Sequence, residues 1–169
     1  PVLNVFYIAG QSNADGRANL TQEDYSMSFP NVKTVLNRKG GIVDYGFTLN
    51  TNYNYNYSPE ISLINRLSKD TRFPHVFCLK KAVGGSSFSS GDWNKGDTYY
   101  NQMVEDFTIF KQVYDQKEFD INVIFLWIQG ENDAENPTEA AAYENALTTF
   151  LSDVKADFGL TSWNVIISR

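Results

Sequence analysis

The chain has 169 residues, 42% of them hydrophobic and 15% aromatic, which indicates one globular domain with a well-developed core. Its net charge of −6 and its lack of a basic stripe argue against a nucleic-acid partner. The single cysteine, Cys78, excludes an internal disulfide and a multi-cysteine zinc site.

The first apolar run, residues 2–9, predicts a buried strand that turns sharply at Gly10-Gln11-Ser12-Asn13. Ser12 therefore lies just past the carboxyl end of a strand, where open α/β sheets place their chemistry. A serine there either acts as a nucleophile or caps the following helix, and this tetrapeptide alone leaves both interpretations open.

The next segments are more polar. Residues 14–31 indicate a loop with at most a short helix, and its cation Arg17 is either a solvated charge or a contact to substrate or loop. Residues 32–36 and 42–47 predict short extended pieces that form a hairpin. The Asn- and Tyr-rich residues 50–57 are either a plain exposed loop or a surface that stacks on sugar rings.

The remainder of the chain alternates helices with strands. Ser58-Pro59 and Asn136-Pro137 begin helices, and an aromatic stripe from Tyr99 to Tyr114 indicates a third. Strands are expected at residues 75–83, 122–128 and 163–167, and the second is expected to be covered on both faces. This order predicts a three-layer α/β/α fold of flavodoxin-like type, with about five parallel strands in a single domain over residues 1–169.

Three of these strands end in polar, glycine-containing blocks: Gly10-Gln11-Ser12-Asn13, Gly84-Gly85-Ser86-Ser87 and Gln129-Gly130-Glu131-Asn132-Asp133. In a parallel sheet all three blocks lie on one rim and surround one small pocket. Together they resemble the SGNH-type hydrolase superfamily, in its branch of sialic-acid-type O-acetylesterases and carbohydrate acetylesterases. The resemblance extends over essentially the whole chain.

The resemblance implies that Ser12 is the nucleophile, and that the backbone of Ser12 and Gly85 and the side-chain amide of Gln129 form the oxyanion hole. Such donors supply a large part of the catalysis of acyl transfer. Asn13, Arg17 and Ser86 are expected to contact substrate. Glu131 either orients a catalytic histidine or, with Asn13 and Asp133, holds the rim together by hydrogen bonds.

One element of that family is missing. An Asp-x-x-His element after the fifth strand supplies the general base in the family, whereas this sequence has one histidine, His75. His75 begins a strand and is expected at the opposite edge of the sheet from Ser12, roughly 25–30 Å away. We therefore expect the domain to lack its C-terminal segment, with the catalytic histidine beyond Arg169.

The sequence thus predicts a serine esterase that removes O-acetyl groups from a sialate- or xylan-type carbohydrate, without a metal or organic cofactor. No membrane partner is expected, because no apolar run approaches 18 residues. The alternative is a catalytically inactive glycan-binding or structural module of a cell-surface or phage tail protein. An extracellular, cell-surface or virion-associated location is favoured over the cytoplasm.

Overall fold

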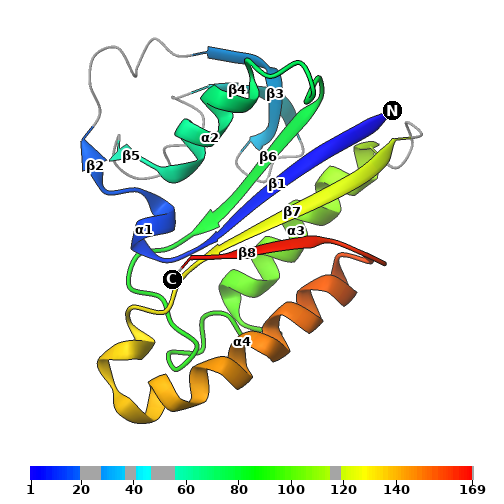
Figure 1. The fold of residues 1–169 in the computed structure, drawn as a ribbon. Coiled ribbons are helices and arrows are strands. Elements are labelled where there is room, and N and C mark those ends of the chain that lie inside the picture. The colour runs from blue at the N-terminus through cyan, green and yellow to red at the C-terminus, as the bar shows by residue number, and fades with distance from the viewer. Residues whose placement is uncertain (20–27, 37–40, 47–55, 115–118, 169) are drawn as a thin grey trace.

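The computed structural model describes residues 1–19, 28–36, 41–46, 56–114 and 119–168. Its centre is a six-stranded sheet in the order β4-β3-β6-β1-β7-β8. Five strands are parallel and β4 is antiparallel to β3. Figure 1 shows β1 in the middle of this sheet, flanked by β6 and β7.

The middle strands are β1 (Val2–Gly10), β6 (Val76–Ala82) and β7 (Asp120–Ile128). β1 is buried from Leu3 to Gly10, which explains why it is apolar except at Asn4. Gly10 is level with Ala82 on β6 and with Ile128 on β7. The three strands therefore end at one edge of the sheet, and the segments that follow them meet there.

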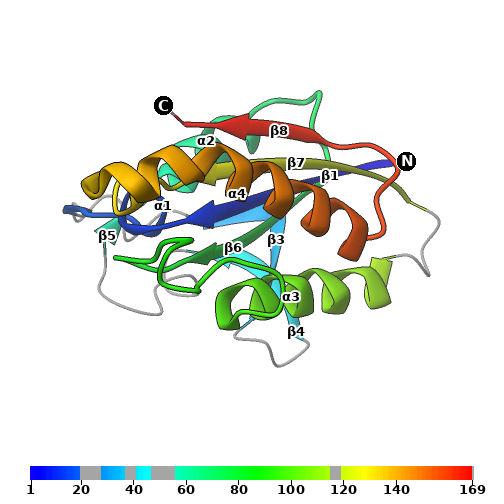
Figure 2. The same cartoon turned by 90° about the horizontal axis from the view of Figure 1, so that it is seen from below.

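Helices cover both faces of the sheet, which gives three layers (Figure 2). On one face α3 (Thr98–Tyr114) and α4 (Pro137–Asp157) pack over an aromatic-rich core. On the other face lie α2 (Pro59–Leu67) and the single turn α1 (Ser12–Asp15). Ile61, Ile64 and Leu67 of α2 are buried as their helical spacing predicts.

The predicted caps and connections are largely confirmed. The Asn136 side chain accepts a hydrogen bond from the Thr138 amide at 2.8 Å and so caps α4. Ser58 precedes α2, but its side chain makes no capping hydrogen bond.

The hairpin consists of β3 (Ser28–Leu36) and β4 (Gly41–Gly46), and the last strand is β8 (Asn164–Ile167). A small second sheet pairs β2 (Ala18–Asn19) with β5 (Asn56–Tyr57).

The three-layer α/β class with five parallel strands is confirmed, with one difference in strand order. In flavodoxin the first two strands of the parallel sheet are neighbours. Here β6 lies between β1 and β3, so β1 pairs with the third and fourth strands of the parallel sheet and not with the second. This order brings the loop after β6 next to the turn that follows β1.

The prediction that β7 is covered on both faces is wrong for this structure. Val123, Phe125 and Trp127 are fully buried under α3 and α4, whereas Ile124, Leu126 and Ile128 on the opposite face are only partly buried. Beside them Ile166 of β8 is 54% exposed. We call this row of four side chains the apolar strip. It exists because α2 packs over β1, β3 and β6 and leaves β7 and β8 open.

Polar residues continue the open face toward the amino ends of the strands. The Asn122 amide donates to Asn4 Oδ1 at 2.9 Å, and the Asn164 amide donates to Asn122 Oδ1 at 3.4 Å. These three asparagines form a ladder across β1, β7 and β8. The ladder supplies the buried side chain of Asn4 with a hydrogen-bond partner.

Among the described helices none is both long enough and apolar enough to cross a membrane. Most of the Asn- and Tyr-rich segment, up to residue 55, lies outside the described residues, as do Phe47 and Arg169. The interpretations of that segment as a loop or a sugar-stacking surface stay predictions.

Candidate active site

The site begins where β1 ends at Gly10. Its φ is +145°, and a Cβ built there would lie 1.9 Å from the Ile128 carbonyl oxygen, so only glycine fits. The turn is fixed on both sides: the Val83 amide donates to Gly10 O, and the Gln11 amide donates to Ile128 O, each at 3.0 Å. Ser12 follows as the half-buried first residue of α1.

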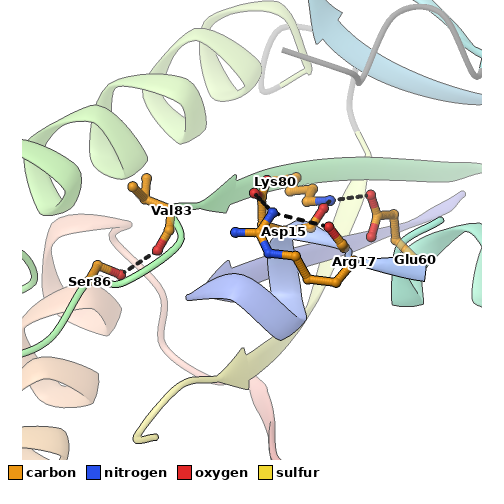
Figure 3. Close-up of polar contacts among 7 residues, drawn as sticks. Asp15, Arg17, Glu60, Lys80, Val83 and Ser86 are labelled. Carbon is orange, nitrogen blue, oxygen red and sulfur yellow. Dashed lines mark hydrogen bonds and ion pairs between the residues drawn. The ribbon is translucent and has the colours of Figure 1, made fainter. Parts of the chain in front are cut away.

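The loop after β6 passes next to Ser12. A Cβ built on Gly84 would lie 3.9 Å from Ser12 Cβ and 2.2 Å from Arg17 Nη2. Arg17 thus reaches over Gly84, and both its guanidinium and the Ser12 side chain lie next to the Cα of Gly84. Figure 3 shows this guanidinium beside Asp15, to which it donates at 3.0 Å. Arg17 is about half exposed, with a side-chain exposure of 48%, which suits a contact to substrate.

Two of the predicted oxyanion donors, the amides of Ser12 and Gly85, belong to the two segments that meet here. Gly85 follows Gly84 and is exposed. Among the described residues, no acceptor is bonded to the amides of Ser12 or Gly85. Free amides beside a nucleophile are what an oxyanion hole requires. Their roles stay predictions, because no acyl oxygen is present to define the geometry.

Gln129 lies in a different environment from the one its predicted role requires. It is 7% exposed, and its Nε2 lies 2.6 Å from Asp133 Oδ2, 3.2 Å from Gln11 Oε1 and 3.2 Å from Ser86 O. An amide has two hydrogens, so these three acceptors occupy both. Donation to an oxyanion would require the amide to release one of them. The structure therefore favours a role in fastening the rim, and the oxyanion role of Gln129 stays a prediction.

Asp133 holds the loop after β6 against the end of β7. Its buried carboxylate accepts from the amides of Phe88 and Ser89 at 3.1 to 3.3 Å, in addition to Gln129. Tyr143 supports the same block from α4: its hydroxyl donates to Gln129 O at 2.7 Å and accepts from Trp127 Nε1. Burial is the main cause that raises the pKa of Tyr143 to about 12, so this hydroxyl keeps its proton.

Glu131 contacts Asn13 at the rim of the sheet. Its carboxylate accepts a short hydrogen bond from the Asn13 side-chain amide, and both residues are exposed. This contact joins the turn after β1 to the loop after β7. Of the two sequence interpretations of Glu131, the structure favours the one that holds the rim together.

Ser86 is buried, and its hydroxyl is used within the loop. It donates to Val83 O at 2.8 Å, as Figure 3 shows, and accepts from Trp93 Nε1 at 2.9 Å. We expect Ser86 to shape the Gly84-Gly85 segment, and direct contact with substrate stays an untested prediction.

A comparison with protein families identifies the family of this chain. The family model described as carbohydrate esterase, sialic acid-specific acetylesterase matches residues 2–169. The chain belongs to this family of carbohydrate esterases. A search of curated proteins gives no match.

Solved structures agree on the fold of this esterase family. A protein from Arabidopsis thaliana aligns with a TM-score of 0.79 at 18% identity, over 99% of this chain and 74% of that one. A carbohydrate acetylesterase from Xanthomonas citri aligns with a TM-score of 0.59 at 16% identity, over 96% of this chain and 40% of that one. This chain therefore spans less than the full length of either protein.

Two features of this esterase domain were missed by the sequence analysis. The side-chain amide of Asn132 donates a hydrogen bond to Gly85 O at 3.2 Å and so contacts the proposed oxyanion segment directly. A buried ion pair, Lys80 with Glu60, lies beneath α1. Asn132 stood within a motif already singled out, but Lys80 lies inside a strand and Glu60 inside a helix, where no sequence signal links them.

The structure confirms the expected position of His75. It is exposed, precedes β6 at the amino edge of the sheet, and packs against Phe119 with ring centroids 6.1 Å apart. Ser12 lies at the carboxyl edge, so His75 does not reach it. Among the described residues, no side chain hydrogen-bonds the Ser12 hydroxyl, and no cluster of His, Cys, Asp or Glu is arranged to hold a metal ion.

Proposed function

We propose that this chain carries the nucleophile and oxyanion-binding segments of a serine esterase that removes O-acetyl groups from a carbohydrate. The observation that carries the proposal is the junction of Ser12, Gly84 and Gly85, where a half-buried serine faces exposed backbone with free amides. Membership of the carbohydrate esterase family supports the substrate class.

In the proposed reaction the Ser12 oxygen attacks the acetyl carbonyl carbon while a histidine takes the hydroxyl proton. The amides of Ser12 and Gly85 hold the negative charge that develops on the carbonyl oxygen. The sugar hydroxyl leaves with the proton from the histidine, and water then hydrolyses the acetylated serine to release acetate. Arg17, about half exposed beside Ser12, is placed to contact the sugar.

The histidine is proposed to come from polypeptide outside residues 1–169. Two independent observations support this. His75 is the only histidine in the sequence and lies at the wrong edge of the sheet. The apolar strip on β7 and β8 also leaves Ile166 54% exposed, and a helix that packed along this strip would have one of its ends beside the carboxyl edge where Ser12 lies.

The decisive experiment measures release of acetate from acetylated xylan and acetylated sialic acid by the complete polypeptide. Ser12→Ala is expected to lower kcat at least about a thousandfold, because the covalent route is lost. Ser152→Ala, which removes an exposed hydroxyl on α4, is the matched control and is expected to leave kcat unchanged. Equal activities of the Ser12→Ala variant and the unchanged protein would refute the proposal.

The second candidate function is an inactive glycan-binding module, which the distance between His75 and the Ser12 junction favours. It predicts no acetate release by the complete polypeptide, together with binding of acetylated glycan that Ser12→Ala leaves intact. The same preparation therefore distinguishes the two functions.

A further inference from the structure

The nucleophilic turn has an anchor that the esterase mechanism does not by itself require. α1 has only four residues and two backbone hydrogen bonds, from the Asp15 amide to Gln11 O at 2.8 Å and from the Gly16 amide to Ser12 O at 3.0 Å. An isolated single turn is unstable, because its hydrogen bonds do not offset the ordering of its backbone. The position of Ser12 must therefore come from contacts with the rest of the domain.

Contacts at the start of the turn come from the rim already described. At its end Arg17 contacts the Asp15 carboxylate and the Gly16 carbonyl from the surface, and Lys80 adds a charged contact from the interior. The Lys80 ammonium donates to Asp15 O at 2.8 Å and to Glu60 Oε1 at 2.7 Å (Figure 3). A cation at the carboxyl end of a helical turn satisfies a carbonyl that has no partner within the helix.

The pair is buried and joins three elements. The side chains of Lys80 and Glu60 are 9% and 1% exposed, on β6 and in the first turn of α2 respectively. Lys80 is level with Ile8 of β1, two residues before the strand reaches Gly10. Removing two charges from water is costly, so a pair of this kind contributes little net stability compared with apolar side chains of similar volume.

The contact chain continues from Asp15 to the surface. The backbone of Asp15 is held by Lys80, and its carboxylate holds the Arg17 guanidinium over Gly84. The buried Lys80 ammonium thus holds the backbone of Asp15, which both ends the turn that begins at Ser12 and carries the carboxylate that binds Arg17. Neither Lys80 nor Glu60 touches the point where the acetyl group is expected.

We propose that Lys80, held by Glu60, is a positioning residue that sets the place of Ser12 relative to Gly84 and Gly85. The inference rests on the proposed function, because it assigns Ser12 as the nucleophile. A displacement of about 1 Å at a reacting group lowers turnover by up to a hundredfold, which is the effect expected when the anchor is lost.

The test uses the double variant Lys80→Met/Glu60→Leu, which removes both charges and leaves no buried ion alone. Thermal unfolding followed by circular dichroism establishes that it folds. In the complete polypeptide kcat is expected to fall tenfold to a hundredfold, with KM for 4-nitrophenyl acetate within about threefold. Lys80→Arg keeps a cationic donor and is expected to recover most of kcat. The control Asp70→Leu/Arg72→Met removes an exposed ion pair far from α1 and is expected to leave kcat unchanged.

Amide hydrogen exchange measured by mass spectrometry supplies a readout that needs no activity. Residues 11–16 are expected to exchange at least tenfold faster in the double variant, while residues 2–9 keep their protection. If the double variant does not fold, Glu60→Asp, which draws the carboxylate back from Lys80, supports the same comparison with smaller effects.

Unchanged kcat would overturn the inference, whether or not exchange is faster, and unchanged exchange would also overturn it. If Ser12→Ala retains full activity, the proposed function fails on its own evidence. The exchange measurement then still decides whether Lys80 anchors the turn.

Discussion

Replacing Gly10 with alanine tests the junction of β1 and β7 on which the site is built. The added Cβ would lie 1.9 Å from the Ile128 carbonyl oxygen and 2.5 Å from its carbonyl carbon. Both are backbone atoms within a paired strand, so no side-chain rotation relieves the collision. The residue would also have to hold a φ of +145°, which alanine rarely adopts.

The expected loss of stability follows from these contacts. An unfavourable backbone conformation costs about 1 to 3 kcal/mol. Separating the strands weakens the hydrogen bonds from Gln11 to Ile128 and from Val83 to Gly10, each worth about 1 kcal/mol. Together these effects amount to roughly 3 to 5 kcal/mol, a large fraction of the roughly 5 to 15 kcal/mol that stabilises a typical domain.

Urea unfolding followed by tryptophan fluorescence measures this loss, because Trp127 lies one residue before Ile128 and is fully buried. Gly84→Ala is the matched control. Its Cβ would collide only with the end of the flexible Arg17 side chain and would make an ordinary contact with Ser12 Cβ at 3.9 Å, so stability is expected to change by less than about 1 kcal/mol. A Gly10→Ala variant as stable as Gly84→Ala would refute the account of this junction.

Three further predictions concern residues away from the junction. His75→Gln is expected to leave acetate release by the complete polypeptide within about twofold, because His75 lies at the opposite edge of the sheet; a loss as large as that of Ser12→Ala would identify it as the base. Burial raises the pKa of the Cys78 thiol well above its usual value, so a thiol-reactive chromogenic disulfide should label it only in denaturant, and rapid labelling of the folded protein would contradict its placement. Hydrogen bonds from Lys95 and Tyr100 lower the pKa of Asp157 below 3.8, so its contribution to stability is present above that pH and is lost as the pH falls through the lowered value. Asp157→Asn should therefore flatten the decline of the urea midpoint as the pH falls below 3.8, and identical slopes would argue against this contribution.

The sequence was sufficient for the strands and for the edge at which their ends meet. Apolar runs that stop at or near glycine are a local signal: Gly10 and Gly84 directly follow such a run, and Gly130 follows one after Gln129. The shared edge then follows from parallel pairing alone. This is why Ser12 and Gly84 lie beside each other as expected, although 72 positions separate them in the sequence.

What the sequence left undetermined depends on the orientation of side chains. Gln129 stands in a motif suited to an oxyanion donor, but the direction of its amide is set by Asp133 and by the carbonyl of Ser86. Lys80 stands between Leu79 and a second lysine on β6, and its ammonium meets Glu60 only because α2 packs beside that strand. Gln129 and Asp133 are neighbours in one motif, but the contacts with Ser86 and Glu60 join separate elements and have no local pattern.

The placement of β1 between β6 and β7 also has a kinetic consequence. Every strand that pairs with β1 comes much later in the chain, since residue 10 is level with residues 82 and 128. At about 5 to 20 residues per second, a ribosome needs several seconds after β1 to complete β6, and longer to complete β7. During that interval an apolar strand from Val2 to Gly10 has no partner, so the nascent chain is exposed to aggregation and to chaperone binding. Pairing over such sequence separations is slow, so refolding of this domain is expected to take milliseconds to seconds and to be limited by the docking of β1.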